Sequence, residues 1–164
     1  MIREQVIHPL EPIYNNNSKV LILGTMPSPV SRQQSFYYAH PQNRFWKVMF
    51  EMLGQPFSIE KEDRIKLCLD NGIALWDVLK SCTIEGASDS SIKNAVPNDL
   101  SVILGTADIK AIFTTGQTAG KLYKKLCCPQ TGIEALVLPS PSGANCAIKI
   151  ETLLSRYSEI LKYL

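Results

Sequence analysis

A run of aromatic residues followed by a histidine and an asparagine gives this sequence its most chemically useful set of side chains. The run is FYYAHPQN, and it includes Tyr38, His40 and Asn43. Aromatic rings stack on flat ligands, an imidazole can donate or accept a hydrogen bond, and a side-chain amide does both. Together these groups predict a pocket for a flat ligand.

Such a pocket needs elements that position it, and the sequence supplies a strand before it and a helix after it. Residues 19–23 form a short apolar run bounded by turn residues, which is typical of a strand buried on both faces of a parallel sheet. Residues 44–53 are mostly apolar and are followed by Gly54, as expected for a buried helix. Chemistry in parallel sheets lies beyond the carboxyl ends of the strands, so we expect residues 24–43 to line a substrate site.

The other elements alternate in type, and this alternation indicates the fold class. A polar segment at 81–98 is expected to be a long loop that acts as a lid or a binding edge. Alternating strands and helices predict a three-layer α/β/α sandwich with a central four-stranded, mainly parallel sheet, formed by residues 1–164 as one domain. The further strands are expected at 73–79, 110–114 and 134–138, and the further helices at 58–69, 99–105, 117–126 and 147–161.

Composition favours a soluble globular protein, with 45% hydrophobic and 20% charged residues. No apolar run approaches the ~20 residues that span a bilayer, and the N-terminal segment lacks the apolar core of a signal peptide, so we expect a cytoplasmic protein with no membrane partner. The five cysteines lack a CxxC spacing, which argues against a disulfide framework, a zinc site or an iron–sulfur cluster. We therefore expect neither a metal nor a cofactor.

Charge is segregated along the chain. Residues 12–50 contain no acid but four bases, and residues 109–150 contain five lysines against Glu134. Residues 51–108 contain ten acids against five bases. A polyanion that docks on the loops of the first and last thirds would meet several cations and little repulsion, which is compatible with a nucleic-acid partner; chance combined with solubility explains the pattern equally well.

Each expected strand is followed by a loop of unusual composition. GTMPSP follows the first strand, the segment 76–98 the second, TTGQT the third and LPSPSGAN the fourth. These loops converge on one edge of the sheet, where small residues and free backbone amides suit a phosphate backbone. Proline and glycine also serve simply to punctuate turns, so composition leaves both interpretations open.

These motifs resemble those of the uracil-DNA glycosylase superfamily over nearly the whole chain. GTMPS lies at the position of that superfamily's first motif, and FYYAHPQNRFWKVM is similar to the mismatch-specific uracil and thymine glycosylases. LPSPSGAN resembles the second motif, the loop that presses into DNA where a nucleotide has been extruded. The resemblance implies a glycosylase fold and DNA as the partner.

One departure from the family pattern narrows the resemblance. Mismatch-specific relatives have a catalytic asparagine immediately before the proline of the first motif, and other branches have an acid there or nearby, whereas this chain has Met26. The family 6 hypoxanthine-DNA glycosylases also lack a catalytic residue at this position. They share the YYAHPxN motif and a segment similar in sequence to residues 76–99. In that branch catalysis is assigned to the asparagine of HPxN, which implies Asn43 here.

An asparagine suits the chemistry that the resemblance implies. Cleaving an N-glycosidic bond gives the sugar oxocarbenium character and the departing base a negative charge, with no covalent nucleophile required. The carbonyl of Asn43 can hold water or face the cation, and its NH₂ group can donate to the base. Position alone favours a helix cap for Asn43, and the two roles are compatible.

The same resemblance assigns base-binding roles. An extruded base needs a ring to replace its lost stacking, and Tyr38 is implied as that ring, while Gly24, Thr25 and Met26 are expected to line the base site. His40 could donate to a phosphate or to the leaving base, although a lone loop histidine is commonly structural.

Asp77 follows the second strand at the same edge of the sheet. Its carboxylate could accept the N1–H of hypoxanthine or place water, or simply cap a loop. Asn98 in the PND triplet is better explained as a helix cap. A further group of residues is expected to contact the DNA and to recognise little of its base sequence. They are Pro27, Ser28, Ser140, Ser142, Gly143, Ala144 and Asn145.

The sequence therefore predicts a monofunctional DNA glycosylase, because no motif singles out a lysine as a Schiff-base nucleophile. It would extrude a deaminated base from double-stranded DNA, release hypoxanthine and leave an abasic site, acting as a monomer. Three alternatives stay open: a uracil or mismatch-specific uracil glycosylase, a non-catalytic domain that binds damaged DNA, and an enzyme of free nucleosides or nucleotides.

Overall fold

The computed structural model describes residues 3–164, and its centre is a four-stranded parallel sheet with the strand order β3-β2-β6-β7. Its inner strands β2 and β6 are buried along their full length, as the apolar runs predict. The sheet is made of β2 (Val20–Gly24), β3 (Ile73–Asp77), β6 (Ala111–Thr115) and β7 (Ala135–Leu138).

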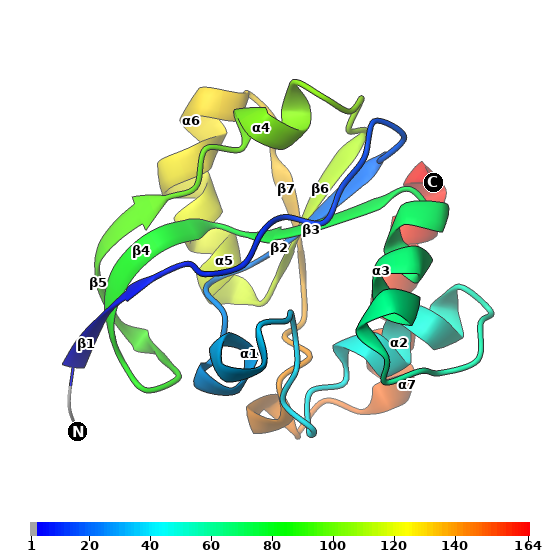
Figure 1. The fold of residues 1–164 in the computed structure, drawn as a ribbon, viewed down its shortest axis with the longest axis horizontal. Helices are drawn as coiled ribbons and strands as arrows, with labels where there is room; N and C mark the ends of the chain where they lie inside the picture. Colours follow the sequence, from blue (N-terminus) through cyan, green and yellow to red (C-terminus); the bar gives the residue numbers. More distant parts are fainter. Residues whose placement is uncertain (1–2) are drawn as a thin grey trace.

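Helices cover both faces of this sheet. Figure 1 shows α2, α3 and α7 on one side and α5 and α6 on the other. The first group is α2 (Phe45–Met52), α3 (Lys61–Asp70) and α7 (Ile150–Tyr157), which a 3₁₀ turn at Ser158–Tyr163 extends. The second group is α4 (Ser101–Leu104), α5 (Gln117–Leu122) and α6 (Cys128–Thr131), with a π-helical turn at Tyr123–Cys127 between the last two. The predicted three-layer α/β/α sandwich is confirmed.

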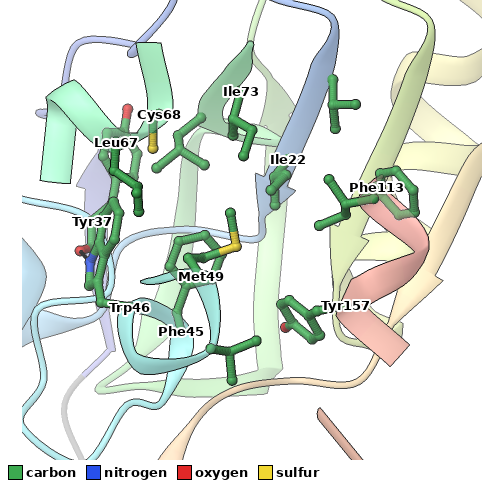
Figure 2. Close-up of a cluster of buried hydrophobic side chains, with 14 of the residues drawn as sticks. Ile22, Tyr37, Phe45, Trp46, Met49, Leu67, Cys68, Ile73, Phe113 and Tyr157 are labelled. Carbon is green, nitrogen blue, oxygen red and sulfur yellow. Dashed lines mark hydrogen bonds between the residues drawn. The ribbon is translucent and has the colours of Figure 1, made fainter. Parts of the chain in front are cut away.

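Two apolar cores hold the layers together. On the α2 side, Ile22 and Phe113 of the sheet pack with Phe45 and Met49 of α2 and Tyr157 of α7, as Figure 2 shows. On the other face, the opposite side chains of the same strands pack against α4 and α5 and against the second sheet. Strand β2 contributes side chains to both cores, Val20 and Ile22 to one and Leu21 and Leu23 to the other.

A second sheet, which sequence reasoning did not predict, lies beside the first. It is antiparallel with the order β1-β4-β5 and consists of β1 (Arg3–Ile7), β4 (Leu79–Glu85) and β5 (Ser88–Pro97). The segment 81–98, expected to be a loop, is thus mostly a β-hairpin. Its polar composition concealed the strands, because β5 is largely exposed and needs few apolar residues. The strand expected at 73–79 ends at Asp77, and the chain then passes into the second sheet.

One further helix interrupts the long loop after β2. Helix α1 (Pro29–Gln34) begins after Ser28, whose Oγ accepts a hydrogen bond from the backbone N–H of Ser31 at 3.2 Å. The Ser31 Oγ in turn accepts from the N–H of Ala39 at 3.1 Å. These two bonds fix the path of the loop on its way to the aromatic run. No helix within residues 3–164 is long and apolar enough to cross a membrane.

Candidate active site

A cavity of about 160 Å³ lies at the carboxyl ends of β2, β3 and β6, where the sequence places the site. Loops from all four parallel strands reach this edge or its vicinity, and the tip of the β4–β5 hairpin closes one side. Ten of the expected site residues line this cavity: Gly24, Thr25, Met26, Pro27, Ser28, Tyr38, Asn43, Asp77, Ser140 and Ser142.

The floor of the cavity is formed where β2 pairs with β3, at Gly24 opposite Asp77. A Cβ atom on Gly24 would lie 2.4 Å from Oδ1 of Asp77 and 3.2 Å from Oη of Tyr38. Any larger residue at position 24 would therefore displace the carboxylate. Gly24 is a packing requirement of the site, because it lets the acid and the tyrosine approach the backbone of the strand.

Tyr38 is held in one orientation. Its backbone has a φ of 51°, and its ring stacks on Phe45 with centroids 3.9 Å apart and planes 14° apart. Its Oη lies 3.0 Å from Oγ1 of Thr115, at the end of β6. Burial, and secondarily the charge of Asp77, raises the pKa of the Tyr38 hydroxyl well above its ordinary value, so the hydroxyl stays protonated. Phe45 covers one face of the ring, and Tyr38 also lines the cavity.

Asn43 lines the cavity and lies immediately before Arg44, the N-cap of α2. Its Oδ1 accepts a hydrogen bond from the backbone N–H of Phe45 at 2.9 Å, and its own N–H donates to the carbonyl of His40 at 2.9 Å. Within residues 3–164 its NH₂ group makes no hydrogen bond, so this donor is free to meet a ligand. Position suggested that Asn43 is the helix cap, but α2 begins at Phe45 and its N-cap is Arg44, so Asn43 lies one residue earlier and its bond to Phe45 is an Asx turn that orients the amide.

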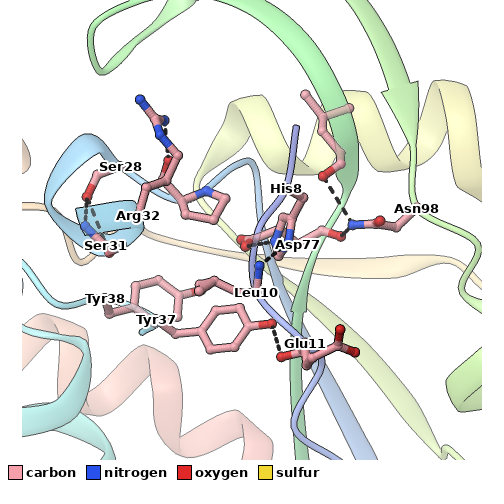
Figure 3. Close-up of polar contacts among 12 residues, drawn as sticks. His8, Leu10, Glu11, Ser28, Ser31, Arg32, Tyr37, Tyr38, Asp77 and Asn98 are labelled. Carbon is pink, nitrogen blue, oxygen red and sulfur yellow. Dashed lines mark hydrogen bonds and ion pairs between the residues drawn. The ribbon is translucent and has the colours of Figure 1, made fainter. Parts of the chain in front are cut away.

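His8, which no motif contains, is the partner of Asp77. Its Nε2 lies 2.7 Å from Oδ2 of Asp77, and the two side chains are 2% and 5% exposed (Figure 3). The chain has two histidines, each followed by proline, and sequence reasoning considered His40 because it lies in the aromatic run. Only the tertiary structure could identify His8, because nothing near it in sequence points to the cavity.

His40 itself is exposed and lies outside the cavity lining. Its Nδ1 accepts from the backbone N–H of Gln42 at 3.1 Å, and its carbonyl accepts from Asn43. In this arrangement His40 shapes the turn that presents Asn43. The direct base contact that the sequence suggested for His40 stays a prediction.

The hairpin contributes a second carboxyl group to the cavity. Asp89 belongs to an exposed strand, yet its carboxyl faces Thr25 and the charge of Asp77. Burial of this carboxyl, followed by repulsion from Asp77, raises the pKa of Asp89 above its ordinary value. Sequence reasoning missed Asp89 because the segment carried no motif.

The loop after β7 is tied to the segment that carries Asn43. The N–H of Arg44 donates to the carbonyl of Pro141 at 2.9 Å, and its guanidinium donates to the carbonyls of Asn145 and Ile148 at 3.1 and 2.6 Å. Arg44 is one of the four bases in the acid-free segment 12–50. Its guanidinium is engaged with backbone carbonyls. A Cβ on Gly143 would lie 2.8 Å from that of Gln42, which shows how closely the two loops approach.

The rest of this loop borders a neighbouring groove. Ala144 and Asn145 line it together with Ser140 and Ser142, while Gly143 packs against Gln42. The Nδ2 of Asn145 donates to the carbonyl of Ser140 at 3.0 Å, which keeps the loop compact. The loop therefore borders the mouth of the cavity, where the expected DNA contacts need it, and those contacts stay predictions.

No group of three or more His, Cys, Asp or Glu side chains within residues 3–164 could hold a metal ion. The side chains that the structure brings to the cavity are an amide donor at Asn43, an aromatic ring at Tyr38 and a carboxylate at Asp77. This set can stack a flat ring, accept a hydrogen bond from it and donate one to it. It can hold a heteroaromatic base and stabilise negative charge on it.

Comparison with known proteins places this geometry in context. Residues 11–162 match the family described as the uracil DNA glycosylase superfamily. A hypoxanthine DNA glycosylase of Methanosarcina barkeri is 35% identical over 136 residues, which cover 82% of this chain and 85% of the relative. A protein of the same name from Methanosarcina acetivorans is 36% identical over 135 residues, covering 81% of this chain and 84% of that relative.

A solved structure is similar as well. The solution NMR structure of a uracil DNA glycosylase candidate from Methanosarcina acetivorans superposes with a TM-score of 0.78 at 30% sequence identity. The superposition covers 94% of this chain and 98% of that one. Shared sequence and shared architecture thus extend over nearly the whole chain, as the motifs of the first and last loops predict.

Proposed function

Because this chain belongs to the uracil DNA glycosylase superfamily, we propose that it is a DNA glycosylase that releases hypoxanthine from deoxyinosine and leaves an abasic site. The observation that carries the proposal is the meeting of Asn43, Tyr38 and Asp77 in one small cavity at the edge of the sheet. The two hypoxanthine DNA glycosylases that the chain resembles support the choice of base.

The first step is the capture of the extruded base. A base that leaves the duplex loses its stacking energy. Stacking on a protein ring recovers on the order of 1–3 kcal/mol of that free energy. Tyr38 supplies this ring, and the base stacks on the face that Phe45 does not cover. The ring is held in place because it stacks on Phe45 and its hydroxyl is hydrogen-bonded to Thr115. Met26 and Pro27 add apolar surface beside it.

The second step is recognition of the base by hydrogen bonds. Asp77 presents a carboxylate oxygen at the floor of the cavity, and a carboxylate only accepts. In hypoxanthine attached to deoxyribose, N1–H is the one strong donor of the ring, so it is the group that this oxygen accepts from.

The third step is cleavage of the glycosidic bond. As the bond breaks, the electron pair moves onto the base, and the sugar gains oxocarbenium character. The bond from Phe45 N–H to Oδ1 orients the Asn43 amide. Its NH₂ group donates to the base as negative charge develops there. Water then adds to C1′ of the sugar and loses a proton, which gives the abasic site, and the released base anion takes up a proton to become neutral hypoxanthine. No covalent bond to the protein forms, so the enzyme is monofunctional.

The partner is DNA that carries a damaged base, and we place the extruded nucleotide of double-stranded DNA in the cavity. The protein acts as a monomer in this proposal. The loop at 139–145 lies at the cavity mouth, where it contacts the phosphates that flank the extruded nucleotide.

The test is incubation with oligonucleotide duplexes that contain one deoxyinosine, followed by alkali. Strand breaks at deoxyinosine that require alkali are expected, because an abasic site breaks in base and a monofunctional enzyme does not break the strand itself. A deoxyuridine duplex and a single-stranded deoxyinosine oligonucleotide run beside it. Absence of breaks at deoxyinosine contradicts the proposed substrate, and breaks only at deoxyuridine identify a uracil enzyme. Binding without any base release identifies a non-catalytic domain.

A further inference from the structure

His8 is a titratable residue with a buried side chain that lies behind the cavity lining and that the proposed reaction leaves unused. It follows β1, outside the parallel sheet, and reaches Asp77 across the boundary between the two sheets. Its side chain is 2% exposed, so it does not itself meet a ligand. Any effect of His8 on the site must therefore pass through Asp77.

The hydrogen bonds of the His8 ring define its protonation. The backbone N–H of Leu10 donates to Nδ1 at 3.2 Å, so Nδ1 carries a lone pair and no hydrogen. The ring hydrogen is then on Nε2, which donates to Oδ2 of Asp77 at 2.7 Å. Oδ2 of Asp77 thus accepts from a donor that the Leu10 N–H orients.

Both partners are anchored independently of each other. The N–H of His8 donates to the carbonyl of Lys80 at 2.7 Å, and the His8 ring packs edge-on to Trp76 with centroids 6.4 Å apart. The carbonyl of Asp77 accepts from Nδ2 of Asn98 at 2.9 Å. Asn98 thus binds the turn after β3 and does not reach the cavity. A fixed donor facing a fixed acid leaves Asp77 one side-chain orientation.

That orientation decides what Asp77 offers to a ligand. With Oδ2 engaged by His8, the remaining oxygen Oδ1 lies over Gly24, beside the hydroxyl of Tyr38. A single fixed acceptor can pair with a ring N–H. It repels a ring nitrogen that presents a lone pair in the same place.

We propose that His8 is a positioning residue that holds Asp77 as a single, fixed acceptor, and so restricts the site to bases whose ring nitrogen carries a hydrogen next to a carbonyl group. This proposal rests on the proposed glycosylase function. Hypoxanthine, xanthine and uracil belong to that class. Adenine, which presents a bare N1 at the same place, is excluded by repulsion.

The first test is a double-mutant cycle on deoxyinosine duplexes under single-turnover conditions. His8→Leu is expected to lower the rate by up to about 100-fold, because the carboxylate is no longer held in place. His8→Gln, whose amide N–H reaches about as far as Nε2, restores most of the rate, whereas the shorter His8→Asn does not. In an Asp77→Asn background, His8→Leu has no further effect. An equal loss in both backgrounds overturns the proposal, as does full activity of His8→Leu.

The second test measures the ratio of the release rates of two substrates for each enzyme. A smaller folded fraction lowers both rates equally, so it does not change this ratio. The second substrate is 1-deaza-deoxyinosine, in which C–H replaces N1–H. Wild type is expected to prefer deoxyinosine strongly, and His8→Leu and His8→Asn are expected to lose most of that preference. An unchanged preference shows that His8 is merely structural. If wild type releases no hypoxanthine, the proposed function fails instead, so the two failures are distinguishable.

Discussion

The cavity has two walls of different construction. One wall is the carboxyl edge of the parallel sheet, where β2 and β6 are buried throughout and Tyr38, Asn43 and Asp77 are each held by hydrogen bonds. The other wall is the tip of the β4–β5 hairpin, where Gly86, Ala87 and Asp89 line the cavity. The pairing of β4 with β5 shifts register repeatedly, and β5 is largely exposed.

This difference indicates a division of tasks. Groups that act on a reacting base must stay within a fraction of an ångström of their positions, and the buried sheet supplies that constancy. An exposed, irregular hairpin can move without disturbing either core. We therefore expect changes in the sheet wall to affect chemistry strongly, and changes in the hairpin wall to affect access and charge mildly.

The largest effect is expected for Asn43→Asp in the sheet wall. Aspartate keeps the oxygen that accepts from Phe45 N–H, so the hydrogen bond at the start of α2 is retained, but it lacks the donor that stabilises the departing base. Single-turnover release of hypoxanthine should fall by about 100- to 1,000-fold, with little change in the melting temperature.

Asn43→Ala is the companion variant, because it removes both the hydrogen bond to Phe45 N–H and the donor. It should be as inactive as Asn43→Asp and also less stable by about 1 kcal/mol. Substantial turnover by Asn43→Asp would show that the free amide is not the catalytic group.

Gly24→Ala is expected to have the next largest effect. The added Cβ would lie 2.4 Å from Oδ1 of Asp77, so the acid or the strand must shift. We expect the free energy of unfolding in urea to fall by about 1–3 kcal/mol, and hypoxanthine release to fall with it. Ala87→Ser on the hairpin wall is the matched control and should change stability by no more than about 0.5 kcal/mol. Equal effects of the two changes would remove the distinction between the walls.

Arg44→Ala and Lys47→Ala should separate two cations that the sequence treats alike. Loss of the Arg44 guanidinium frees the carbonyls of Asn145 and Ile148, so stability should fall by about 1.5–3 kcal/mol. Lys47 is exposed, and its loss should leave stability unchanged. The second readout is DNA affinity measured at several salt concentrations. If Lys47 contacts a phosphate, its removal lowers the slope of the logarithm of the affinity against the logarithm of the salt concentration by about one. A stable Arg44→Ala protein contradicts this account of the loop.

The smallest effect is expected for Asp89→Asn in the hairpin wall. Burial and Asp77 raise the pKa of Asp89, so the folded protein binds this proton more tightly than the unfolded chain does. Stability due to Asp89 therefore falls as pH rises from the ordinary carboxyl pKa through the raised one. Asp89→Asn should melt slightly above wild type at neutral pH, and the difference should shrink as the pH is lowered. A difference that grows at low pH would give the opposite sign and exclude this account.

The sequence predicted the sheet wall well because its signals are local. The apolar run before Gly24 defines β2, and the aromatic run with Asn43 lies between that strand and an amphipathic helix, so spacing alone placed these residues at one edge. The motif resemblance, confirmed by the family match, then indicated what the edge does.

The hairpin wall and the partner of Asp77 could not be predicted in the same way. His8 reaches Asp77 across 69 positions of sequence, and no pattern near His8 signals that contact. Strand β5 is polar because it is exposed, so its composition is that of a loop. Arg44 is one of the four bases in residues 12–50, and the charge pattern could not indicate that its guanidinium donates to backbone carbonyls.

Phe45 joins two functions in one residue. Its backbone N–H orients the Asn43 amide, and its ring supports the ring of Tyr38. The platform and the donor therefore move as one mechanical unit whenever the first turn of α2 shifts. Efforts to widen the range of accepted lesions should leave position 45 alone and vary the hairpin tip, since a tilt at Phe45 would cost capture and cleavage together.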